Sequence, residues 1–192
     1  MASLPMMMAN ELRSHLQPVR FGLLLGLLTV LYGWSLGVVF GVGEDGIREG
    51  FLADAEASRT LYLQKAATED AATALIKEMD ETAWRYFLRA HLHAGGIGSI
   101  AIGGSLVLAL VTARRAYKAG ASLLLGIGSL GYSLFWMLAG LRAPGLASTA
   151  AAKESLRWLA IPSSGALVAG GVITLALIVH DLFLRRHPSA SA

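Results

Sequence analysis

The sequence predicts an all-α integral membrane protein: a bundle of four transmembrane helices, with an amphipathic helical segment outside the cytoplasm between helices 1 and 2. Three observations carry this prediction. Of the 192 residues, 55% are hydrophobic and only 15% are charged, a composition typical of membrane proteins. Four segments are almost free of charge over about the 20 residues that a bilayer requires. The basic residues adjoin these segments, where they act as topology signals.

The first predicted elements are a cytoplasmic N-terminal segment, residues 1–20, and a first transmembrane helix, residues 21–42. The apolar run of this helix is longer than the roughly 7–15 residues of a signal-peptide core. The sequence GVGEDG that follows it is not a small-x-small cleavage site. We therefore expect an uncleaved signal anchor.

Residues 43–93 form the predicted extracytoplasmic segment, which carries most of the acidic residues. Apolar side chains recur at three- and four-residue steps between residues 72 and 87, and this spacing predicts an amphipathic helix. Thr68, followed by two acidic residues, is the expected helix start. The helix can continue directly into the second transmembrane helix, with Gly95 and Gly96 as its weakest point.

The remaining elements follow from charge-free runs and from the short connections between them. We expect transmembrane helices 2, 3 and 4 at residues 94–113, 119–141 and 163–184, a cytoplasmic loop at 114–118, an extracytoplasmic loop at 142–162 and a cytoplasmic tail at 185–192. Basic residues precede the first helix, join the second to the third and follow the fourth: Arg13, Arg20, Arg114, Arg115, Lys118, Arg185 and Arg186. The positive-inside rule then places both termini in the cytoplasm, and we expect a bacterial-type inner membrane.

Small residues at four-residue spacing occur on the first and second predicted transmembrane helices. Helices in lipid are held together by close packing and hydrogen bonds, and small residues allow that close approach. The predicted helix-packing residues are Gly33, Gly37, Gly41, Gly95, Ser99 and Gly103. We expect them to pack within the bundle or against a partner protein.

The stretch before the second transmembrane helix contains the candidate binding residues His91 and His93, together with Trp84, Tyr86 and Arg89. Residues two apart on a regular helix point in nearly opposite directions. The two histidines could therefore share a metal ion only if residues 94–96 were non-helical, and Asp80 or Glu81 would then complete the site.

These histidines could also bind a cofactor other than a metal ion. A haem with two axial histidines from one chain would lack its second ligand here, whereas a haem shared between subunits, a singly ligated haem or a quinone remains possible. We expect that none of these is bound and that both histidines are interfacial side chains.

Several function classes are disfavoured by the sequence. It has no cysteine, and its net charge of +3 is too small for nucleic-acid binding when the basic residues flank apolar segments. No predicted span carries Asp, Glu, Lys or Arg at mid-depth, which disfavours an ion-coupled transporter. No P-loop, GxSxG or HExxH motif occurs, so we expect a protein that is not an enzyme.

Three functional hypotheses remain. The first is a small multi-pass membrane subunit or accessory protein of a larger complex, which binds partners through its glycine-rich helix faces and its outer helices. The second is a membrane redox or cofactor-binding protein that uses His91 and His93. The third is a small-molecule channel or carrier, lined by the aromatic residues Tyr32, Trp34, Tyr132 and Trp136.

Overall fold

The computed structural model describes residues 4–184, and within this range the chain consists of helices joined by short connections, without strands. The helices in chain order are α1 (Leu4–Leu16), the 3-10 turn η1 (Gln17–Val19), α2 (Arg20–Ala57), α3 (Arg59–Leu63), α4 (Glu69–Leu110), α5 (Arg115–Arg142), α6 (Thr149–Ser155), α7 (Arg157–Val179) and the π-helical turn η2 (His180–Leu184). The predicted tail at 185–192, with Arg185 and Arg186, lies outside the described residues.

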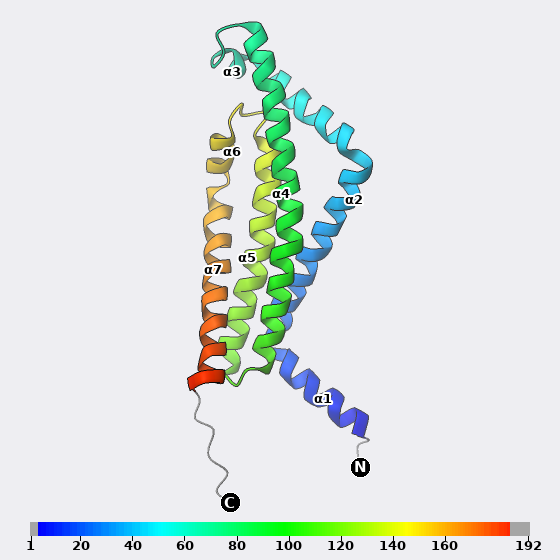
Figure 1. The fold of residues 1–192 in the computed structure, drawn as a ribbon, viewed down its shortest axis with the longest axis vertical. Coiled ribbons are helices and arrows are strands. Elements are labelled where there is room, and N and C mark those ends of the chain that lie inside the picture. Colours follow the sequence, from blue (N-terminus) through cyan, green and yellow to red (C-terminus); the bar gives the residue numbers. More distant parts are fainter. Residues whose placement is uncertain (1–3, 185–192) are drawn as a thin grey trace, which may run out of the picture.

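Four helical stretches are long and apolar enough to cross a membrane: Met6–Ala57, Glu69–Leu110, Arg115–Arg142 and Arg157–Leu184. The predicted all-helical fold with four membrane-length helices is therefore confirmed. Figure 1 shows α4, α5 and α7 running side by side, with α2 against the same bundle at its lower half. The helix α1 and the last turn of α7 lie at the same end of the bundle.

Two long helices extend beyond the predicted transmembrane segments. α2 continues past residue 42 to Ala57 and bends at Gly43, where φ is −134° and ψ is 15°. α4 is one helix from Glu69 to Leu110, with no break at Gly95 or Gly96. A glycine inside a helix costs only about 1 kcal/mol relative to alanine, and packing against α2 and α5 outweighs that cost. At about 1.5 Å per residue, α4 is roughly twice as long as the ~30 Å hydrocarbon layer.

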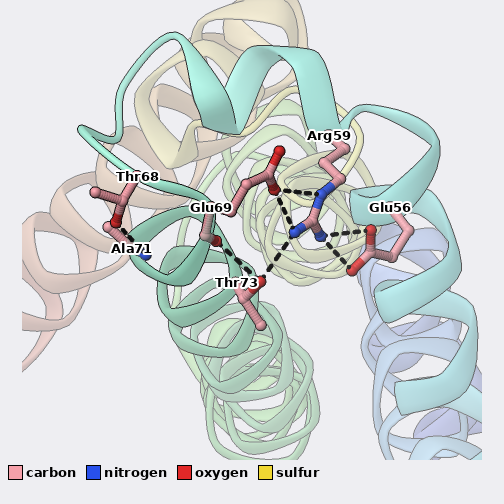
Figure 2. A network of polar contacts seen from close by, with 6 residues as sticks. All are labelled: Glu56, Arg59, Thr68, Glu69, Ala71 and Thr73. Carbon is pink, nitrogen blue, oxygen red and sulfur yellow. Dashed lines mark hydrogen bonds and ion pairs between the residues drawn. The ribbon is translucent and has the colours of Figure 1, made fainter.

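The start of α4 forms as its sequence predicts. The Thr68 hydroxyl accepts a hydrogen bond from the backbone N–H of Ala71 at 3.2 Å, which confirms Thr68 as the N-cap. Figure 2 shows Arg59 beside this cap, donating to Glu69 at 2.8 Å, to Glu56 and to Thr73. One guanidinium group thereby joins the end of α2 to the start of α4.

The turn at α3 is held against the connection between α5 and α6. Tyr62 is only 1% exposed, and its hydroxyl donates to the backbone oxygen of Pro144 at 2.7 Å. Ser58 donates to the backbone oxygen of Gly145 at 2.7 Å. Burial raises the pKa of Tyr62 to about 12. The outer parts of α2 and α4 are therefore fixed to the rest of the bundle.

Lys118 caps the opposite end of α4. It is 7% exposed, and its ammonium group donates to the backbone oxygens of Ala109 at 2.9 Å and Val111 at 3.0 Å. The last carbonyls of a helix have no partner within the helix, so this side chain satisfies groups that the turn would otherwise leave unpaired.

Lys118→Met is therefore expected to lower the free energy of unfolding by about 1–3 kcal/mol, because two carbonyls lose their donor. The measurement is unfolding of the purified protein by a denaturing detergent. Arg115→Met is the matched control, since Arg115 is exposed and its loss removes the same charge. An equal effect of the two substitutions would contradict the capping role.

Candidate functional site

His91 lies on the face of α4 that packs against α2. Its Nδ1 is 2.7 Å from the backbone oxygen of Gly33; since a carbonyl only accepts, Nδ1 carries the hydrogen. The ring also lies 5.9 Å from that of Phe40, edge to face. A side chain at Gly37 would approach the imidazole Cε1 to 2.9 Å. The imidazole of His91 thus fills a gap between two helices that the absence of a side chain at Gly37 leaves open.

His93 lies on a different face of α4 and contacts α5. Its ring is stacked on Tyr132 at 5.3 Å and lies 6.2 Å from the ring of Trp136. Because α4 is helical through residues 94–96, the local break that would bring both imidazoles to one ion is not formed. Among residues 4–184, no group of three or more His, Asp or Glu side chains is placed to hold a metal.

His93 belongs to an aromatic cluster, which we define as Tyr86, His93, Tyr132, Phe135 and Trp136. Arg89 contacts two rings of this cluster. The guanidinium carbon of Arg89 lies 4.4 Å from the Trp136 ring centroid and 5.6 Å from that of Tyr86. This is the geometry of a cation–π contact. The Trp136 Nε1 is buried and has no hydrogen-bond partner in the described structure, so the cluster contains one unsatisfied donor.

The aromatic cluster lies beside apolar stretches of the neighbouring helices. Trp136 precedes Arg142, the first charge at that end of α5, by more than one helical turn. On the other side, Gly37 precedes Glu44 of α2 by a similar length. Arg89 and both histidines therefore lie alongside apolar stretches of α2 and α5. Arg89 itself is exposed.

Trp84 is separate from the aromatic cluster. It packs on the α2 side, with its ring centroid 5.0 Å from that of Phe40 and the guanidinium carbon of Arg48 5.1 Å above it. The five candidate binding residues thus divide into two sets. Trp84 and His91 face α2, whereas Tyr86, Arg89 and His93 face α5.

Arg48 forms an ion cluster that the sequence did not reveal. It donates to Asp80 at 2.8 Å, to Glu44 at 2.8 Å and to Glu81 at 3.1 Å. Asp80 is 8% exposed, and its Oδ1 has no hydrogen-bond partner within the described residues. The cluster links the bent outer part of α2 to α4, and it pairs Arg48 with both of the carboxylates that were candidates to complete a metal site at His91 and His93.

Two of the predicted packing glycines lie in helix contacts within the chain. A side chain at Gly33 would approach the Ala94 Cβ to 2.9 Å, and one at Gly37 would meet His91. The other four predicted packing residues, three glycines and one serine, are open. No atom lies within 4 Å of an added Cβ at Gly41, Gly95 or Gly103, and Ser99 is exposed, with its hydroxyl donating to the backbone of Gly95.

The tightest glycine contacts lie at positions outside the set of predicted packing residues. An added Cβ at Gly128 would lie 2.5 Å from the backbone nitrogen of Leu167, and one at Gly170 would lie 2.8 Å from that of Leu125. An added Cβ at Gly22 would overlap Ser122. These positions set the closest approaches of α5 to α7 and of α2 to α5.

The aromatic residues proposed to line a channel do not point toward a common cavity. Trp34 is 65% exposed on the outside of α2. Tyr32 donates to the sulfur of Met137 at 3.1 Å, whereas Tyr132 is stacked on His93. Between α2 and α5, the hydroxyls of Thr29 and Ser129, both fully buried, are hydrogen-bonded at 3.2 Å. These contacts are those of packed helices.

His91→Leu is expected to lower the thermal unfolding temperature in detergent by several degrees, because the bond to Gly33 and the aromatic contact with Phe40 are lost together. His93→Phe retains the stacking on Tyr132 and is expected to change that temperature little. The opposite order of effects would contradict the assignment of the two rings to different helix contacts.

Comparison of the chain with protein-family models, with curated proteins and with solved structures finds no match.

Proposed function

We propose that the protein is a multi-pass membrane subunit or accessory protein that binds another membrane protein through one exposed face of α4. We call this face the α4 strip and define it by Gly96, Ser99 and Gly103. These residues are exposed, and steps of three and four residues keep them on one side of a helix. The opposite side of α4 packs against the chain itself, through buried residues such as Ala94, Gly98, Ala101, Ser105 and Leu108.

The glycines of the α4 strip carry the proposal. Each glycine inside a helix costs about 1 kcal/mol relative to alanine. At Gly98 a close helix contact accompanies that cost, since an added Cβ would lie 2.9 Å from Val30. At Gly96 and Gly103 no atom lies within 4 Å of an added Cβ. A partner helix packed on the strip would supply the missing contact, as small residues do between helices in lipid.

Exposed apolar side chains support insertion in a bilayer. Large hydrophobic residues cover the outside of α2 and α7; Val38 is 68% exposed, Val168 65% and Leu175 63%. Continuous apolar surface of this kind marks a membrane or protein contact. Arg13, Arg20 and the basic residues of the α4–α5 connection lie at the same end of the bundle, so the positive-inside rule favours cytoplasmic termini in a bacterial-type inner membrane.

The test is recovery of partner proteins with Gly103→Leu purified from the native membrane in mild detergent. We expect the partner to be lost at least tenfold, while the unfolding temperature stays at the wild-type value. Gly171→Leu on α7 is the matched control, because Gly171 is also exposed and also has no atom within 4 Å of an added Cβ. Equal partner recovery with the two variants would contradict the proposal.

The aromatic cluster supports cofactor binding as a second candidate function. The unpaired Trp136 Nε1 and the guanidinium of Arg89 are donors that suit a carboxylate or a quinone carbonyl. A reduced-minus-oxidised absorption spectrum of the native preparation would then show a haem or quinone band that Trp136→Phe diminishes. A spectrum without such a band would exclude these two redox cofactors.

A further inference from the structure

The junction of α1 with α2 forms a hollow of about 780 Å³, which we call the elbow pocket. In Figure 1, α1 leaves the lower end of α2 at an angle, and residues of both helices line the hollow. Its α1 side includes Arg13 and Leu16, and its α2 side includes Arg20, Leu23, Leu24 and Leu27. The volume lies within the roughly 300–1,000 Å³ typical of ligand sites.

The polar end of the elbow pocket is positively charged. Arg13 and Arg20 both line it, and no acidic residue does. Neither arginine makes an ion pair in the described part of the chain, although Arg20 lies 4.7 Å over the ring of Phe21. Two arginines that line one hollow suit a phosphate, which arginine binds with paired hydrogen bonds.

The other end of the elbow pocket is apolar and open to the membrane side of α2. Leu24 is 53% exposed and Leu27 is 51% exposed. On α1, Met7, Met8 and Leu12 are each at least 60% exposed, as expected for a helix that lies in the interface and buries its apolar side chains in lipid. A molecule that fits both ends has an anionic head and a hydrocarbon chain.

We propose that the elbow pocket binds one anionic glycerophospholipid. Its phosphate lies between Arg13 and Arg20, and one acyl chain follows Leu23, Leu24 and Leu27 into the bilayer. The bound lipid holds α1 at a fixed angle to the bundle. This inference rests on the proposed membrane insertion of α2, but it does not depend on a partner at the α4 strip.

The experiment is native mass spectrometry of the full-length protein released from detergent, titrated with phosphatidylglycerol or phosphatidylcholine. We expect one tightly retained phosphatidylglycerol, and its retention should weaken about 10- to 30-fold in Arg13→Gln/Arg20→Gln, from the loss of two basic side chains near the membrane surface. Arg114→Gln/Arg115→Gln is the matched control, because it removes two charges at the same end of the bundle.

Three results would overturn the proposal: equal loss of lipid in the control, equal retention of phosphatidylcholine, or displacement of the lipid by an equal concentration of glycerol phosphate, which lacks acyl chains. Lipid-free unfolding temperatures equal to wild type would show that the arginine variants fold. Partner recovery is measured on the same variants, so a failed lipid site and a failed α4 strip give different results.

Discussion

Gly128→Leu is expected to prevent stable folding of the bundle. An added Cβ at this position would lie 2.5 Å from the Leu167 nitrogen and 2.7 Å from its Cα. These are backbone atoms, so no change of side-chain rotamer can relieve the clash. Overpacking by a methylene alone costs about 1–3 kcal/mol, and a clash with a whole helix exceeds that. Since α7 packs mainly on α5, we expect a loss above about 4 kcal/mol, a large part of a typical stability.

The measurement is the fraction of folded protein recovered in detergent, compared with Gly171→Leu. The control introduces the same side chain on α7 where no atom lies within 4 Å of an added Cβ. We expect near-normal recovery for Gly171→Leu and little or none for Gly128→Leu. Equal recovery of the two variants would show that α5 and α7 are not in the close contact described here.

Arg48→Met has the second large expected effect, about 3–5 kcal/mol, because it leaves a mostly buried carboxylate without its counter-ion. Asp80 is 8% exposed and has its second oxygen already unpaired. The free energy of unfolding is the quantity to compare. Arg157→Met is the control: Arg157 pairs with Glu154 at 3.3 Å, but the two side chains are 65% and 70% exposed, so its loss should cost less than about 1 kcal/mol.

A double substitution distinguishes the contribution of the Arg48–Asp80 ion pair from other contributions of Arg48 to stability. Arg48→Met combined with Asp80→Leu removes both charges, and replacing a buried pair by apolar residues is often neutral. We therefore expect the second change to restore most of the stability lost in the first. A double variant as unstable as the sum of its two single variants would contradict the pairing.

The number of membrane-length helices follows from the sequence, because the lack of charge over about 20 residues is a local property. The N-cap at Thr68 is local in the same sense. The lengths of α2 and α4 are not local properties of the sequence. A helix that packs on neighbouring helices can continue past the point where charged residues begin. The bend at Gly43 and the uninterrupted helix through Gly95 both depend on such tertiary packing.

The sequence was sufficient to predict the directions in which the candidate site residues leave α4. It was not sufficient to predict which residues they contact. Helical geometry alone indicates that His91 and His93 diverge, and α4 places them so. Their contacts with Gly33 and Tyr132 depend on the register of α4 against α2 and α5. The spacing of residues within one helix does not determine that register. The same limit applies to the glycines: spacing identifies Gly37 and Gly103 equally, whereas the rotation of each helix places Gly37 against His91 and leaves Gly103 exposed.

Photo-crosslinking in the native membrane tests the proposed partner contact most directly. A photoreactive amino acid is placed at Ser99 on the α4 strip or, as the control, at Leu175 on the exposed outside of α7. We expect Ser99 to give a crosslinked protein of one discrete mass and Leu175 to give lipid adducts. Lipid adducts alone at both positions would contradict a partner-binding role for the α4 strip.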